Sequence, residues 1–118
     1  MRVDIRLAHP ISRANATELP SVLIDTGASW TTLPRRLADA LELDILGQIT
    51  GRTVEGVQRL DQSFVYIEIP ANDRRGVTPV LISDTLDEVL IGVLTLEALA
   101  LAVDPLDNRL TETELLLL

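Results

Sequence analysis

The stretch VLIDTGAS, residues 22–29, decides how this chain is expected to fold. Its first three residues form a short apolar run of the kind that makes a buried strand. A carboxylate, a hydroxyl and a glycine follow directly at Asp25, Thr26 and Gly27. Glycine permits a sharp turn at the end of a strand and lets another backbone approach closely. The pattern therefore predicts a carboxylate at the floor of a cleft, where a buried strand ends.

Length and composition predict one domain, spanning residues 1–118. The chain has 118 residues, of which 47% are hydrophobic, and no apolar stretch is long enough to cross a bilayer. Charges at Arg2 and Asp4 fall where a secretory signal would be apolar. Cysteine is absent, so disulfides and thiolate metal sites are not available. We therefore expect a cytoplasmic protein without a metal, a cofactor or a membrane partner.

The charge pattern argues against a nucleic-acid partner. The net charge is −8, and all 10 basic residues are arginines that never cluster beyond a pair. The single histidine, His9, lies beside a proline and is expected in a loop or at the surface, not in a catalytic triad or a zinc site. The later acidic residues are expected to form solvated faces that bind no metal: Asp84, Asp87, Glu88, Glu112 and Glu114.

Apolar periodicity predicts mostly strands, with two short helices. Strands are expected at residues 2–7, 19–24, 64–69, 77–82 and 89–92. Pro34 should open a helix that presents Leu37, Ala38 and Leu41 on one face, and a second helix is expected at about residues 94–101. Residues 9–17 and 70–76 are predicted to be loops. Such a chain should form a small β domain that is closed or nearly closed.

Residues 48–58 predict a β-hairpin. Gly51 and Gly56 lie among threonine, valine and isoleucine, and the turn is expected near Thr50, Gly51 and Arg52. The two glycines are compatible with an ordinary hairpin turn. A flap that closes over the cleft is the better expectation, because the hairpin follows the Asp-Thr-Gly motif at Asp25.

Further landmarks follow the first motif in a fixed order. Asp-Thr-Gly-Ala at residues 25–28 is followed by Leu-Pro at 33–34, by Leu-Ile-Gly at 90–92 and by Val-Asp-Pro at 103–105. In this order the chain resembles the retropepsin-like aspartic proteases over most of its length, and most closely the small single-domain prokaryotic members. The resemblance implies a mostly β, closed barrel-like acid protease fold, with one or two short helices and one lobe per chain.

The resemblance also implies roles for the motif residues. Asp25 would pair with the same residue of a second chain, share one proton with it and activate a water for attack on a peptide bond. Thr26 would form a hydrogen bond across the two-fold axis of the homodimer. Gly27 would leave room for an extended peptide or protein substrate and offer it a carbonyl. Ala28, Ser29 and the hairpin residues Thr50, Gly51 and Arg52 would contact that substrate.

Two residues depart from the patterns of related enzymes. Ala28 stands where pepsin-like enzymes usually have a serine that can donate a hydrogen bond to the dyad, so we expect a pH optimum less acidic than that of pepsin. Ser29 stands where viral members commonly have a second aspartate, which should affect substrate affinity more than catalysis.

Trp30 could pack in the core or shape a pocket. Gly92 could be a simple strand-to-helix turn.

Three alternatives accompany this interpretation. The same fold could serve as a dimerising, peptide-binding module with little or no proteolytic turnover. The four leucines at 115–118 could be a frayed tail or a buried interface strand, and burial is the better expectation because exposed leucines favour aggregation. Phosphate-binding loops of the actin and sugar-kinase type or the Walker type are excluded, by the length of the chain and by its lack of lysine.

Overall fold

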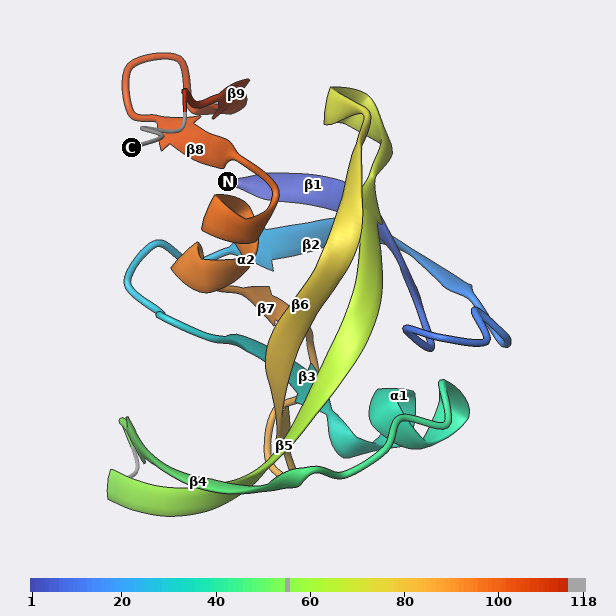
Figure 1. Ribbon diagram of the computed structural model, residues 1–118. Coiled ribbons are helices and arrows are strands. Elements are labelled where there is room, and N and C mark those ends of the chain that lie inside the picture. The colour runs from blue at the N-terminus through green and yellow to red at the C-terminus, as the bar shows by residue number, and fades with distance from the viewer. Residues whose placement is uncertain (55, 115–118) are drawn as a thin grey trace.

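Six strands close into a barrel in the computed structural model, which describes residues 1–54 and 56–114 (Figure 1). Neighbouring strands pair all the way round, because the first strand also pairs with the fifth and so closes the ring. Their order around the ring is β1 (Arg2–Ala8), β2 (Thr17–Ile24), β7 (Leu90–Ile91), β3 (Thr31–Pro34), β6 (Arg74–Ser83) and β5 (Gly56–Ile69). The expected mostly-β closed domain is confirmed.

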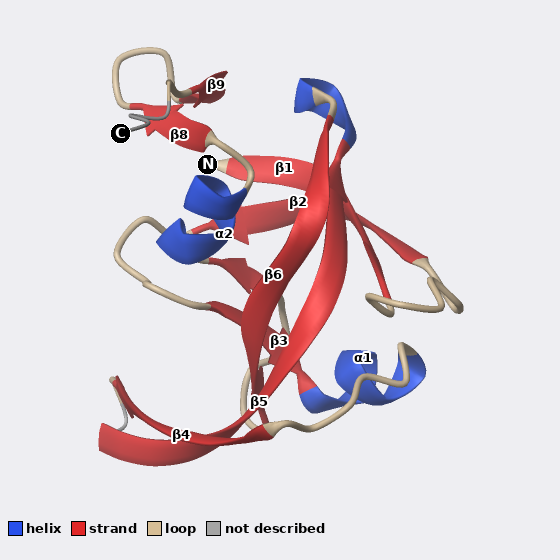
Figure 2. Ribbon diagram, viewed as in Figure 1, coloured by secondary structure: helices blue, strands red, loops and turns tan. Residues whose placement is uncertain are grey.

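The remaining elements are attached to this ring. Strand β4 (Gly47–Thr53) pairs with the first part of β5 to form a hairpin that extends beyond the barrel (Figure 2). The described residues also form two short α-helices, α1 (Arg35–Ala40) and α2 (Val93–Ala98), and a short 3-10 turn, η1 (Pro70–Asn72). Strands β8 (Leu101–Asp104) and β9 (Arg109–Glu112) make a separate two-stranded sheet next to α2. Neither α-helix is long and apolar enough to span a membrane.

The core is built from the apolar faces of the strands. In β5, Val65, Ile67 and Ile69 are fully buried on the face that the alternation predicts. Tyr66 points to the opposite face and is nevertheless buried, because the loop that follows β1 folds over it. The guanidinium carbon of Arg13 in that loop lies 4.1 Å from the centre of the Tyr66 ring.

The hairpin turns later than its sequence indicates. Thr50, Gly51 and Arg52 were the predicted turn, but all three lie inside β4 and pair with β5. The ladder continues as far as the pair Thr53 and Gly56, so the hairpin reverses beyond that pair and not at the predicted residues; residue 55 lies outside the described part. Gly56 has φ +113°, a conformation that side chains rarely adopt. The backbone requirement for glycine is therefore at position 56 and not at position 51.

Other boundaries also differ from the prediction. Strand β3 was not predicted, because a four-residue strand is too short to show a period and its Pro34 indicated a helix start. The second helix ends at Ala98 and not near residue 101, since Ala100 has φ 55° and Leu101 begins β8. The polar turn after β5 is shorter than expected, because β6 already begins at Arg74. The expectation for residues 115–118 lies outside the described residues.

Candidate active site

Asp25 lies where the parallel pairing of β2 with β7 ends. Leu23 pairs with Leu90 and Ile24 with Ile91, and the amide of Asp25 then donates to the Ile91 carbonyl at 2.9 Å. This last bond extends the strand pairing up to the carboxylate itself. Asp25 is half-buried.

The residues that follow Asp25 form a tight turn around its carboxylate; we call residues 25–30 the motif loop. The Gly27 amide donates to Asp25 Oδ1 at 2.9 Å, and the Ala28 amide donates to the Asp25 carbonyl at 3.1 Å. A Cβ atom at Gly27 would lie 3.2 Å from Asp25 Oδ1, so a larger residue would crowd the carboxylate. The carboxylate is thus oriented by the loop's own backbone, while Thr26 and Gly27 are exposed.

Helix α2 holds the second half of the motif loop. The amides of Val93 and Leu94 donate to the carbonyls of Ala28 and Ser29, each at 2.9 Å. The first amides of a helix have no partner within the helix, so these bonds satisfy groups that would otherwise be unpaired. The start of α2 and the motif loop therefore form one hydrogen-bonded unit.

Gly92 allows this unit to be compact. A Cβ atom at Gly92 would lie 2.5 Å from the carbonyl carbon of Trp30, 2.6 Å from its oxygen and 2.9 Å from the carbonyl carbon of Ser29. No side chain fits there, so the sequence feature that indicated a turn marks a close approach of two backbones. The Trp30 side chain itself is half-buried.

Sequence reasoning missed three threonines beneath the motif loop: Thr31, Thr78 and Thr95. All are fully buried, and their hydroxyls are hydrogen-bonded to one another in a row. The only available signal was a polar residue at an otherwise apolar position. A threonine on the solvent face of a strand produces the same signal, and the sequence does not separate the two cases.

The hairpin presents its expected substrate residues on two different faces. Gly51 is half-buried, and a Cβ atom there would contact Leu60 at 3.6 Å. Thr50 and Arg52 are exposed and point to the opposite face, because successive residues of a strand alternate. In Figure 1 the hairpin extends on the side of the barrel where the motif loop lies. The structure therefore brings Asp25 to Ser29 together in one loop, while the hairpin residues belong to a separate element.

A largely apolar cavity of about 380 Å³ adjoins the motif loop at Thr26. Its other walls come from α2 and from β8, with Val93, Ala102 and Val103 only half-buried. The exposed motif residues therefore continue into an apolar concave surface.

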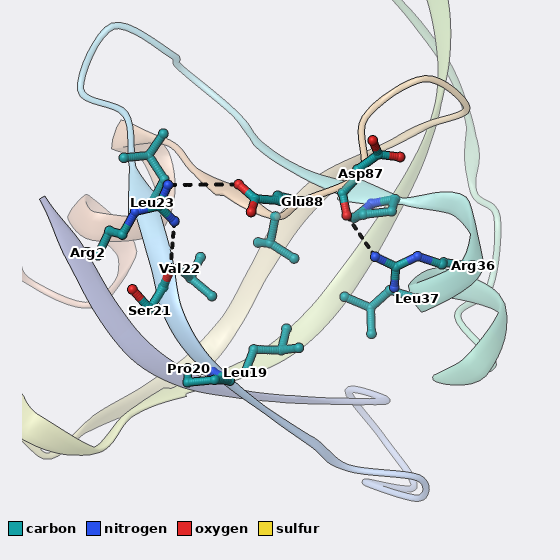
Figure 3. A pocket seen from close by; sticks show the side chains of 12 residues that line it. Arg2, Leu19, Pro20, Ser21, Val22, Leu23, Arg36, Leu37, Asp87 and Glu88 are labelled. Atoms are coloured by element: carbon teal, nitrogen blue, oxygen red, sulfur yellow. Dashed lines mark hydrogen bonds and ion pairs between the residues drawn. The ribbon is translucent and has the colours of Figure 1, made fainter.

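A second cavity, of about 150 Å³, lies between β2, α1 and residues 87–89 (Figure 3). The side chains of Arg2, Arg36 and Glu88 on its rim have partners within the chain. Arg2 donates to the Ser21 carbonyl at 2.8 Å and pairs with Glu88 at 3.9 Å, and Arg36 donates to the Asp87 carbonyl at 2.7 Å. Glu88, which was expected to be solvated, is exposed and also forms this ion pair with Arg2.

His9 and Asp84 have structural contacts. His9 lies in a loop, as predicted; its Nδ1 accepts bonds from the amides of Ile11 and Ser12, and its Nε2 lies 3.3 Å from Asp44. Asp84 is exposed as expected, and the Arg35 guanidinium beside it lowers its pKa. The described residues contain no group of three histidine, cysteine or acidic side chains that could hold a metal ion.

Comparison with known proteins places this architecture among viral proteases. A family model described as gag-polyprotein putative aspartyl protease matches residues 14–98. The simian foamy virus (mac) protease superimposes with a TM-score of 0.57 and 15% identity, over 82% of this chain and 92% of that one. The EIAV protease, in complex with the inhibitor HBY-793, superimposes with a TM-score of 0.62 and 21% identity, over 99% of this chain and 92% of that one. Comparison with curated proteins found no match. The expected acid-protease fold is confirmed.

Proposed function

Because this chain belongs to the gag-polyprotein putative aspartyl protease family, we propose that it is an aspartic endopeptidase that acts as a homodimer. The observation that carries the proposal is the geometry of the motif loop. Asp25 lies at the end of a paired strand, and a backbone amide at 2.9 Å orients its carboxylate. The loop around it is bonded to β7 on one side and to α2 on the other. A carboxylate held in this way is preorganised for proton transfer.

The chemistry requires a second carboxylate, and a second copy of the chain supplies it. The sequence contains one Asp-Thr-Gly motif, and Thr26 and Gly27 are exposed beside an apolar cavity. A two-fold contact through this surface would bring the two motif loops together and would cover the half-buried Val93, Ala102 and Val103. Thr26 would then donate its hydrogen bond across the axis.

The reaction follows from two carboxylates that share one proton. Two such groups at close range are not both ionised without a large penalty, so the pair holds one acid and one base. The ionised Asp25 would take a proton from a water as that water attacks the peptide carbonyl carbon. The protonated Asp25 of the other subunit would donate to the carbonyl oxygen. The tetrahedral intermediate then collapses, and its proton passes through the dyad to the leaving amine.

The substrate would lie extended between the motif loops and the hairpins. Gly27, Ala28 and Ser29 would offer it main-chain groups, in the manner of strand addition. Gly51 would face the substrate from the hairpin. Thr50 and Arg52 point to the outer face, so we propose that they contribute through their main chain.

The test is cleavage of an unstructured polypeptide across a range of about pH 3 to 7. Asp25→Asn, which keeps the shape of the side chain and removes its charge, is the matched control. Wild type should cleave, the variant should not, and specific activity should fall on dilution as the dimer dissociates. If both proteins bind the polypeptide and neither cleaves it, the protein is instead a dimerising peptide-binding module of the same fold.

A further inference from the structure

Three buried threonines link the motif loop to the barrel wall. Thr31 opens β3 directly after the loop, Thr95 lies in α2 and Thr78 lies in β6. Each is 0% exposed. A hydroxyl removed from water in an apolar core is unfavourable unless it is hydrogen-bonded, so their arrangement needs a physical reason.

Their hydroxyls form a row that begins at a backbone amide. Gly92 donates to Thr31 Oγ1 at 3.0 Å, Thr31 Oγ1 lies 2.5 Å from Thr95 Oγ1, and Thr95 Oγ1 lies 2.8 Å from Thr78 Oγ1. The last hydroxyl donates to the Pro79 carbonyl at 3.5 Å. Since each hydroxyl has a single proton, this end favours one direction, in which Thr95 donates to Thr78 and Thr31 donates to Thr95. Every proton in the row is used once.

The amide at the head of the row belongs to the residue on which the motif loop packs. Gly92 packs against the backbone of Trp30. The carbonyl of Ile91 accepts a hydrogen bond from the Asp25 amide, and the amides of Val93 and Leu94 donate to the carbonyls of Ala28 and Ser29. A shift of Gly92 therefore moves contacts along the whole loop. The hydroxyl row holds Gly92 from the other side, in a place that water does not reach.

We propose that Thr95 is a positioning residue, which acts through Thr31 and Gly92 to fix the motif loop against the barrel. The inference rests on the proposed proteolytic function. The positioning role depends on the hydroxyl of Thr95 and not on the shape of its side chain. Valine has nearly the same volume, but it would leave the Thr31 proton without an acceptor at a fully buried site. Thr31 must then turn away from Gly92 or remain unpaired.

Kinetics of Thr95→Val and Thr95→Ser test the proposal with the same unstructured polypeptide. In Thr95→Val, kcat should fall by about tenfold to a hundredfold, because small displacements of a reacting group are costly. KM should rise as well, because the displaced loop also carries Gly27, Ala28 and Ser29, which are proposed to contact the substrate. Thr95→Ser keeps the hydroxyl and should restore kcat. Thr78→Val, which removes only the far end of the row, gives a milder second variant if Thr95→Val fails to fold.

The control is Ile67→Val, which removes one buried methyl group from β5 and leaves the row intact. It should lower stability while kcat stays unchanged. A wild-type kcat in Thr95→Val would overturn the proposal, and so would a serine variant as slow as the valine variant. An equal loss of kcat in Ile67→Val would do the same, because it would reduce the effect to general destabilisation.

Hydrogen exchange of the Gly92 amide tests the positioning separately from activity. The amide should exchange faster in Thr95→Val and at the wild-type rate in Thr95→Ser. If wild type cleaves nothing, the proposed function fails, while this readout still decides whether Thr95 holds Gly92 in place. Unchanged exchange in Thr95→Val would overturn that claim even in an active protease.

Discussion

Replacing Gly92 with alanine should separate the motif loop from the start of α2 by about 1 Å. The added Cβ would lie 2.5 Å from the carbonyl carbon of Trp30 and 2.6 Å from its oxygen, and 2.9 Å from the carbonyl carbon of Ser29. Carbon atoms in favourable contact are about 3.5 to 4.0 Å apart. All three contacts are with backbone, so no side chain can rotate to make room and one chain segment must move.

Two effects of different size follow from this displacement. Overpacking of this kind costs about 1 to 3 kcal/mol of folding free energy. In a domain of this length that corresponds to a fall in Tm of roughly 4 to 12 °C. The second effect is on catalysis, because a shift of about 1 Å in a positioned group can cost on the order of a hundredfold in rate. The loss of kcat should therefore exceed what partial unfolding at the assay temperature explains.

Gly47→Ala is the matched control, since it adds the same methyl group at the start of β4. No atom lies within 4 Å of a Cβ at Gly47. Thermal unfolding and cleavage of the unstructured polypeptide should be measured for both variants and for wild type. Gly47→Ala should keep the wild-type Tm and kcat. A Gly92→Ala protein with wild-type Tm and kcat would refute the close-approach argument.

Three further predictions concern charge and backbone conformation. The Tyr66 hydroxyl donates to Glu68 and lowers the pKa of that carboxyl. The contact therefore stabilises the fold above the ordinary pKa of glutamate, and this stabilisation is lost as the pH falls through the lowered pKa. Chemical denaturation of Glu68→Gln should thus give a lower free energy of unfolding than wild type near neutral pH, and the difference should disappear in acid. Arg35→Gln should return the pKa of Asp84 to its ordinary range, as measured by NMR titration, because Arg35 Nε donates to Asp84 at 2.8 Å. Gly56→Ala should lose about 1 kcal/mol or more in chemical denaturation despite open space around its Cβ, because its φ is +113°; an unchanged midpoint would count against this.

The fold followed from sequence where the chain repeats a simple pattern. Alternating apolar residues identified the long strands, and an apolar run before Asp25 placed the motif at a strand end. The hairpin turn did not follow, because glycines at positions 51 and 56 are both compatible with a turn and only the pairing register with β5 decides between them. Strand β3 did not follow either, since it exists through its pairing with β6 and β7.

The chemistry of the site was predictable from the sequence, but the contacts that hold the motif loop in place were less so. Asp25 to Ser29 form one loop beside Leu90 to Gly92, as the order of motifs indicated, and their catalytic and binding roles remain predictions. The sequence did not reveal that Gly92 is required by the Trp30 backbone or that Thr31, Thr78 and Thr95 join below it. Both facts depend on segments far apart in the chain, and no local pattern reports such contacts.

Several bonds from within the same chain hold the motif loop. The Asp25 amide, the Ala28 carbonyl and the Ser29 carbonyl are each bonded to residues between Ile91 and Leu94, and the carboxylate is oriented by Gly27. These bonds shape one half of the proposed site. In the proposed homodimer, a second copy would add the second carboxylate and the hydrogen bond of Thr26 across the axis. If assembly adds these groups to a loop that each chain has already formed, the concentration of the chain controls activity, and folding of the loop does not.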